Sequence, residues 1–427
     1  MVTVSLLRTT SIDHAKPIDY AVIVHVNFKK LEAREDLEEF QELVASSGCQ
    51  IVDIVTTTRE SSDRRYFVGS GTAEKILAAV QDHKATVVLF NHALTPGQVR
   101  NLEKYLSCRV IDRTGLILDI FAARARTFEG KLQVELAQLQ HLSSRLVRGW
   151  THLEKQKGGI GLRGPGETQL ETDKRLIRNR IETIKERLEK VKMQRKQSRQ
   201  SRQKANMLTV TLVGYTNAGK STLFNTLTAA DVYVQDQLFA TLDPTFRKIT
   251  IAELGPVIVA DTVGFIRHLP HDLVEAFSAT LEEARDADLL LHVIDASDVL
   301  KEEKIAAVNQ VLQQIQADQV PQLLVYNKMD LIDASPCVDR DEAGLPWRVW
   351  VSAKMNIGTA ELMIAMKERL LTDVMHACLV LRGKQGLIRH KLYELGAILN
   401  ETINERGEYC LEVKMPRNVF ESLLGLW

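Results

Sequence analysis

Long hydrophobic runs, a signal peptide and paired cysteines are all missing from this sequence of 427 residues. No run of about 18 apolar residues occurs, so a membrane-spanning helix is not expected. The N-terminus, MVTVSLLRTTSIDHAKP, has neither the basic start nor the long apolar core of a signal peptide. The five cysteines are scattered without the spacings of a disulfide framework or a zinc site. These absences predict a cytoplasmic protein without stable membrane insertion.

The formal net charge of zero conceals a strongly basic segment. Residues 124–205 carry 21 Lys and Arg against 9 Asp and Glu, a net charge of +12, so the rest of the chain carries −12. A run of charge can simply be a solvated helix face. An excess of this size on one segment nevertheless predicts an anionic partner for that segment.

Hydrophobic patterning divides the chain into four predicted parts. Short β-rich runs alternate with helical ones over residues 1–123, which predicts a small parallel α/β domain. Residues 124–205 predict a long antiparallel helical hairpin, and residues 206–371 a larger α/β domain with a parallel sheet flanked by helices. Residues 372–427 predict a small α+β domain, in which 387–405 is expected to be one helix.

The predicted hairpin has two arms of about 24 residues, each about 36 Å long. Apolar residues recur at spacings of three and four along the first arm (Leu132, Leu136, Leu139, Leu142, Leu146) and the second (Ile177, Ile181, Ile184, Leu188, Val191). Between the arms lies the glycine-rich tip KQKGGIGLRGPGETQ, residues 155–169, for which a flexible turn is the alternative. The basic stretch 191–204 is expected to be a helix end or a linker.

Residues 214–221 read GYTNAGKS, which fits G-x-x-x-x-G-K-[ST] directly after the apolar strand LTVTLV and before a helical segment. Gly214 and Gly219 would let the loop turn its backbone N–H groups onto the α- and β-phosphates of a nucleotide. Lys220 would reach the β- and γ-phosphates, and Ser221 would offer its hydroxyl to Mg²⁺. The context of strand, loop and helix argues against a purely structural turn.

Further motifs indicate which base is bound and which reaction follows. Asp261 ends the strand VIVAD and is suited to hold a water of the Mg²⁺ shell, while the Gly264 N–H can reach the γ-phosphate. Asp330, in NKMD, can accept both N1–H and the exocyclic amino group of guanine, an edge that adenine lacks. The expected substrate is therefore GTP. Ser352 and Lys354, in VSAK, can complete the guanine pocket.

In their order and spacing, these motifs resemble those of the translation-factor-related GTPases and, more closely, those of the HflX family. The likeness is most specific over 110–173 and extends from about residue 20 to 371. FATLDPT at 239–245 resembles the switch I of that family, which implies that Thr241 coordinates Mg²⁺ in the GTP state. The residues that the motifs and the resemblance together assign to the nucleotide are Gly214, Tyr215, Thr216, Asn217, Ala218, Gly219, Lys220, Ser221, Thr222, Phe239, Ala240, Thr241, Leu242, Asp243, Asp261, Thr262, Val263, Gly264, Asn327, Lys328, Asp330, Ser352, Ala353 and Lys354. Hydrolysis is assigned to Lys220, Thr241 and Gly264, and Mg²⁺ to Ser221, Thr241 and, through a water, Asp261.

The resemblance implies a bacterial cytoplasmic GTPase that binds the large (50S) ribosomal subunit and splits stalled or idle 70S ribosomes under stress. The basic hairpin agrees with this, because a long element of charge +12 suits phosphate-rich RNA. Lys157 and Arg163, near the tip, are the candidate RNA contacts. A hairpin that must enter a ribosome also favours a monomer. The alternative is a GTP-gated RNA-binding assembly factor for the large subunit, whose hydrolysis is incidental.

Three weaker signals have competing explanations. Asn217 resembles the P-loop asparagine of GTPases that use K⁺, although an asparagine can also simply tolerate the loop backbone. VGSGTAEK at 68–75 could cradle a second phosphate, perhaps of ATP, but an ordinary turn before a helix is favoured. His268 and His271 are expected to face solvent or a partner, because no acidic or cysteine ligand accompanies them.

Phe265 follows Gly264, where the best-known GTPases carry a glutamine that orients the attacking water. An apolar side chain cannot orient water. The isolated protein is therefore expected to hydrolyse GTP slowly and to need an activator, for which the ribosome is the favoured candidate.

Overall fold

The computed structural model describes residues 19–29, 36–149, 165–204, 207–229, 238–239, 241–252, 254–266, 278–371, 374–381, 385–394, 397–404 and 407–416. The chain folds as two compact units, residues 1–117 and 118–427. Within the described residues, no helix is both long enough and apolar enough to cross a membrane.

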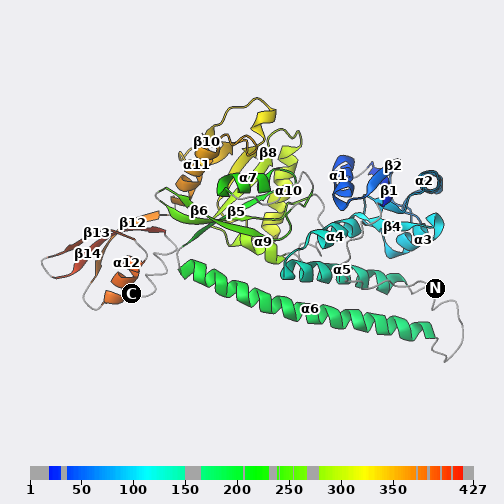
Figure 1. Ribbon diagram of the computed structural model, residues 1–427, viewed down its shortest axis with the longest axis horizontal. Coiled ribbons are helices and arrows are strands. Elements are labelled where there is room, and N and C mark those ends of the chain that lie inside the picture. Colours follow the sequence, from blue (N-terminus) through cyan, green and yellow to red (C-terminus); the bar gives the residue numbers. More distant parts are fainter. Residues whose placement is uncertain are drawn as a thin grey trace. The chain divides into compact units, whose positions relative to one another are not determined.

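The first unit contains a four-stranded parallel sheet in the order β2-β1-β3-β4, as the alternating pattern predicts (Figure 1). The strands are β1 (Tyr20–Phe28), β2 (Gln50–Arg59), β3 (Val87–Phe90) and β4 (Arg109–Asp112). The helices are α1 (Leu37–Ser47), α2 (Ser70–His83), α3 (Pro96–Leu106) and α4 (Arg113–Arg124), of which α4 continues into the second unit. Gly48 ends α1 with a φ of +83°, a conformation that costs glycine little.

Helices α5 (Phe128–Gly149) and α6 (Pro165–Lys204) lie side by side in the second unit (Figure 1). They run antiparallel, because Glu135 pairs with Arg180 while the earlier Glu129 pairs with the later Arg195. The apolar seam between them consists of Leu132, Leu136, Leu139, Ile181, Ile184 and Leu188. The predicted hairpin contacts are therefore present.

Helix α6 differs in length from the predicted arm. It has 40 residues rather than about 24, because it starts inside the segment expected to form the tip and continues to Lys204. The basic stretch 191–204 is thus a helix end and not a linker; it contains no Gly or Pro, and Lys, Arg, Gln and Met all favour helix. Lys157 and Arg163 lie outside the described residues.

A seven-stranded sheet in the order β10-β11-β9-β8-β5-β7-β6 forms the centre of the nucleotide-site region. Its strands are β5 (Leu208–Gly214), β6 (Thr245–Ile251), β7 (Gly255–Asp261), β8 (Leu289–Asp295), β9 (Gln322–Asn327), β10 (Val338–Arg340) and β11 (Pro346–Trp350). The accompanying helices are α7 (Lys220–Thr228), α9 (Ser278–Arg285), α10 (Lys301–Gln314), η2 (Met329–Leu331) and α11 (Thr359–Leu371). The predicted parallel sheet is present in its five central strands, whereas β6 and β10 at the two edges are antiparallel.

The C-terminal part is a three-stranded antiparallel sheet in the order β12-β14-β13 with one helix. Its elements are β12 (Val374–Leu381), α12 (Gly386–Glu394), β13 (Ile398–Ile403) and β14 (Tyr409–Pro416). The expected single helix over 387–405 is wrong, because α12 ends at Glu394 and residues 398–403 form β13. This segment contains β-branched Ile398, Thr402 and Ile403, and pairing with β14 outweighs the helical pattern.

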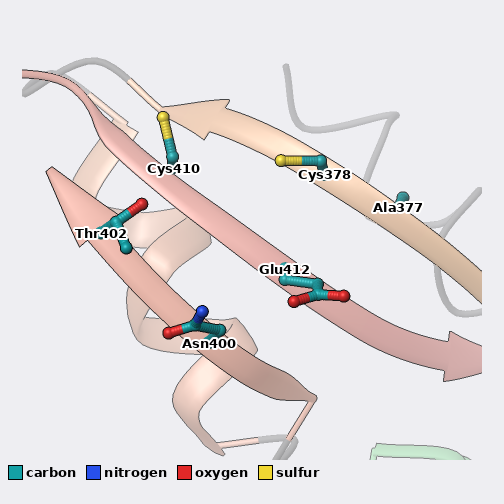
Figure 2. Close-up of a pocket in the computed structure, with 6 residues that line it drawn as sticks. All are labelled: Ala377, Cys378, Asn400, Thr402, Cys410 and Glu412. Atoms are coloured by element: carbon teal, nitrogen blue, oxygen red, sulfur yellow. The ribbon is translucent and has the colours of Figure 1, made fainter. Parts of the chain in front are cut away.

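One face of this small sheet carries a shallow hollow (Figure 2). It is lined by Ala377, Cys378, Asn400, Thr402, Cys410 and Glu412. Cys378 lies opposite Glu412, and Cys410 opposite Val380, so the two cysteines occupy diagonal positions on neighbouring strands. Diagonal neighbours are about 7–8 Å apart, beyond the usual reach of a disulfide, and both thiols are free.

Candidate nucleotide-binding site

The P-loop, which runs from Gly214 to Gly219, joins β5 to α7 and depends on its two glycines. Gly214 has a φ of +147°, and a Cβ there would lie 2.2 Å from the Val293 carbonyl oxygen. Gly219 has a φ of +89°, and a Cβ there would lie 2.2 Å from Asn327 Nδ2. Both positions therefore exclude any side chain. The close approach also places the start of α7, with its N-terminal dipole, directly at the loop.

Lys220 lies beneath this loop and is buried. Its Nζ donates to the carbonyl oxygens of Gly214 at 3.1 Å and Tyr215 at 2.7 Å. Burial lowers the pKa of Lys220 to about 8, and the nearby Asp261 carboxylate opposes that shift. A phosphate at the loop would favour the charged ammonium further, as a phosphate-binding lysine requires.

Three side-chain oxygens converge beside the start of α7. Ser221 Oγ lies 2.8 Å from Thr241 Oγ1 and 2.7 Å from Asp261 Oδ2, and Thr241 Oγ1 lies 3.0 Å from the same carboxylate oxygen. Asp261 Oδ1 is buried and has no hydrogen-bond partner in the described part of the chain. Burial raises the pKa of Asp261, against the effect of the two hydroxyl contacts and Lys220. Hard oxygens in this arrangement, with one carboxylate oxygen still to be satisfied, fit Mg²⁺ and its water.

The segment DTVGF, which begins at Asp261, is joined to the P-loop by its backbone. The Phe265 N–H donates to the Gly214 carbonyl at 3.1 Å, and the Thr216 N–H donates to the Phe265 carbonyl at 2.7 Å. A Cβ on Gly264 would lie 2.9 Å from Thr216 Cα and 3.0 Å from Lys220 Nζ. Gly264 therefore lies where its N–H could meet a γ-phosphate, and only glycine fits there. The Phe265 side chain is 2% exposed and is therefore packed inside the protein.

Asn327 links the P-loop to the loop after β11. Its Nδ2 donates to the Ala218 carbonyl at 2.9 Å, and its Oδ1 accepts from the Ala353 N–H at 3.0 Å. Lys328 has a φ of +62° and pairs with Asp295 at 2.7 Å. Asp330 is exposed at the start of η2, where its carboxylate is free to meet a base. Because β5, β7, β8, β9 and β11 are parallel, all these loops lie at one edge of the sheet, the usual place for a ligand.

Comparison with known proteins identifies the family. The GTPase HflX of Escherichia coli (strain K12) is 59% identical over 399 residues, which cover 93% of this chain and 94% of that protein. The chain belongs to the HflX family of GTPases. It is therefore a GTP-hydrolysing enzyme, as its motifs predict.

Other members and the family models agree with this assignment. The GTPase HflX of Caldanaerobacter subterraneus subsp. tengcongensis is 44% identical over 393 residues, or 92% of this chain and 90% of that protein. Models of the GTP-binding GTPase N-terminal region, its middle region and the 50S ribosome-binding GTPase match residues 34–122, 124–202 and 209–328. Among solved structures, a GTP-binding protein of Sulfolobus solfataricus in complex with GDP has a TM-score of 0.45 and 23% identity, over 83% of this chain and 99% of that chain.

Most residues that the HflX resemblance assigns to the nucleotide gather at this edge, although their contacts with a nucleotide stay predictions. Two residues of switch I, Phe239 and Asp243, instead contact α4 and the start of α5. The Phe239 ring packs edge to face on Phe121 of α4 at 4.6 Å, and the Asp243 carboxylate bonds to the start of α5. Asn217 is exposed with a φ of +61°, so the backbone alone accounts for an asparagine there. Ala240, His268 and His271 lie outside the described residues.

Sequence reasoning missed Asp295 and the bracing role of Asn327 at this edge. Asp295 ends β8 and pairs with Lys328; its signal was a carboxylate at the end of the apolar run LLLHVID. Asn327 was expected to contact guanine, and no sequence pattern disclosed that it also braces two loops. His292, in the middle of β8, is buried beside the P-loop strand. Burial lowers its pKa to about 4.

Proposed function

We propose that this chain is a Mg²⁺-dependent GTPase that binds the 50S ribosomal subunit and uses its GTP cycle to split stalled or idle 70S ribosomes. One observation carries the proposal: the GTP site and the helical pair of α5 and α6 lie in the same unit. The Phe265 side chain of that site is buried, and the helical pair belongs to a segment with a net charge of +12. Such a site needs activation from outside, and such a helical pair suits RNA. The matching family model, described as a 50S ribosome-binding GTPase, supports the same partner.

The roles of the side chains follow from their positions. The P-loop N–H groups and Lys220 would hold the β- and γ-phosphates, and the Gly264 N–H would donate to the γ-phosphate. Ser221 and Thr241 would bind Mg²⁺ directly and Asp261 through a water, and the ion would neutralise charge that develops on the phosphates. Asp330 would select guanine. Release of phosphate would free Thr241 and Gly264 and so relax switch I and switch II, the segment that begins at Asp261.

We further propose that K⁺ stimulates hydrolysis through a site at Asn217. Its amide is exposed at the loop and could help to hold a cation beside the phosphates. Replacing K⁺ by Na⁺ at constant ionic strength should then slow hydrolysis. Equal turnover in the two salts would leave Asn217 with only its backbone role.

The decisive experiment measures GTP hydrolysis by the full chain with and without purified 50S subunits, using Lys220→Ala as the inactive control. We expect slow basal turnover and a stimulation of about 100-fold or more, as external activators of GTPases provide. Intact 70S ribosomes are then mixed with the protein and GTP and sedimented. Free 30S and 50S subunits are the expected product. Stimulation without separation would favour the assembly-factor alternative, and no stimulation would refute the proposal.

A further inference from the structure

Switch I contacts the metal-binding oxygens on one side, and α4 and the start of α5 on the other. On the first side, Thr241 Oγ1 lies within 3.0 Å of Ser221 Oγ and Asp261 Oδ2. On the second, the Phe239 ring packs on Phe121, and both rings are 2% exposed. Switch I is therefore held at both Phe239 and Thr241.

Asp243 bonds to the two residues that precede α5. Its Oδ2 accepts from the backbone N–H groups of Arg126 at 2.8 Å and Thr127 at 2.9 Å, and its Oδ1 accepts from the Thr127 hydroxyl. Thr127 Oγ1 in turn accepts from the Gly130 N–H at 2.9 Å. A Cβ on Gly130 would lie 2.2 Å from Asp243 Oδ1, so this approach requires a glycine. The carboxylate thus satisfies N–H groups at the positive end of α5.

The distance along the chain makes this contact relevant to catalysis. Only Leu242, which is 3% exposed, separates Thr241 from Asp243. Two residues of backbone span at most about 7 Å, so a fixed Asp243 restricts where the Thr241 hydroxyl can lie. Release of Asp243 would free the threonine that approaches the metal position.

The second helix of the pair, α6, also contacts the start of α5. Arg195 of α6 pairs with Glu129 in the first turn of α5 at 2.8 Å, and with Glu283 of α9 at 3.9 Å. Lys192 lies 3.5 Å from Glu282. The end of α6 is therefore connected to the start of α5 and to α9, the helix that follows the DTVGF segment in the chain.

We propose that Asp243 is a positioning residue for hydrolysis: its bond to the start of α5 holds Thr241 at the metal site, so the helical pair controls the rate. The link to a ribosome-bound hairpin rests on the proposed function, whereas the positioning role does not. Asp243 touches neither substrate nor metal in this role and acts only through Thr241.

The test compares variants in single-turnover GTP hydrolysis without ribosomes. Asp243→Ala removes the carboxylate that caps the N–H groups at the start of α5. It should lower the rate at least about fivefold and raise the Mg²⁺ concentration needed for half-maximal rate. Affinity for GDP should stay within about twofold, since the P-loop and base contacts are untouched. Asp243→Asn, which keeps a side-chain acceptor, should retain most of the rate.

The same effect should arise from the helix side. Thr127→Val removes the hydroxyl that bonds Asp243 and leaves switch I unchanged, so it should reproduce the slower rate and the higher Mg²⁺ requirement. Thr183→Val is the matched control, because the exposed Thr183 hydroxyl bonds only to its own helix at Asn179, 2.9 Å away. Wild-type behaviour of Thr127→Val and Asp243→Ala would overturn the inference. A loss of GDP affinity as large as the loss of rate would also overturn it. A failure of 50S stimulation would refute the proposed function and leave this comparison valid.

Discussion

Phe265 shows at the level of one residue how this site differs from the best-known GTPases. Its side chain is buried, while its backbone N–H and carbonyl bond to the P-loop. A polar side chain that took the same position would be packed inside the protein. Catalytic help is then expected from the ribosome, from a bound K⁺ or from a rearranged switch, and the ribosome is the favoured source.

Replacing Phe265 by Gln should therefore fail to create a fast enzyme. We expect the basal rate of Phe265→Gln to stay within about threefold of wild type or to fall, because an amide placed in an apolar site costs stability. Single-turnover hydrolysis without ribosomes measures this. Phe265→Leu, which keeps an apolar side chain, is the control. A rise of about tenfold or more in the glutamine variant would show that the side chain can reach the reaction space.

His292 should make the nucleotide-site region sensitive to acid. Burial lowers its pKa from 6.5 to about 4, so the folded state binds fewer protons than the unfolded state between these values. Stability is then full above about pH 6.5 and falls as the pH drops toward 4, by at most about 3 kcal/mol.

Thermal unfolding is measured at pH 7 and pH 5, and the transition of the nucleotide-site region is recognised because GDP raises its midpoint temperature. His292→Leu should reduce the loss of stability between these pH values relative to wild type. The exposed His83→Gln is the control and should leave the loss unchanged. An identical pH dependence in wild type and His292→Leu would show that His292 is not responsible.

At the scale of elements, prediction from sequence worked where local chemistry decides the boundary. Local chemistry fixes the start of α3, because Pro96 suits a first helical position and Thr95 and Gln98 form a capping box. The P-loop was predicted because its glycines and lysine have a fixed spacing between strand and helix. In such places few residues fix the outcome.

Prediction failed where distant contacts decide. Residues 398–403 follow a helical pattern but form β13, because β14 offers a pairing partner that no local pattern reveals. The same reason explains Asp243: switch I could be recognised from its sequence, but not the direction of its carboxylate toward residues 126 and 127. Sequence spacing locates a motif, whereas tertiary packing decides which side chain faces the ligand.

The seam between α5 and α6 depends on Ile184, which is fully buried. Ile184→Ala should weaken the helical pair by about 3 kcal/mol, since a cavity replaces the side chain. Hydrogen exchange should show lost protection in α5 and α6 while GDP affinity is retained. Leu176→Ala, on the same helix but at a residue that is 58% exposed, should change protection little. Equal effects of the two substitutions would show that Ile184 does not stabilise the packing of α5 on α6.

At the scale of the whole molecule, the division of charge predicts how ribosome binding responds to salt. Basic residues that neutralise RNA phosphates release counterions, so the logarithm of affinity falls linearly with the logarithm of salt concentration. Arg178 and Lys185 are exposed on α6 and lie about two turns apart on the same face. They are therefore suited to contact neighbouring phosphates together.

Neutral variants of these two residues test whether their charges contribute to RNA binding while the fold is kept. Arg178→Gln and Lys185→Gln should each weaken binding to 50S subunits and reduce the salt slope by about one. Sedimentation over a series of KCl concentrations measures both quantities, and unchanged basal hydrolysis confirms that the GTP site is intact. Glu182→Gln, an exposed acid between them on the same face, should not reduce the slope. If all three variants behave alike, the helical pair does not bind RNA through this face, and the charge of the segment serves another purpose.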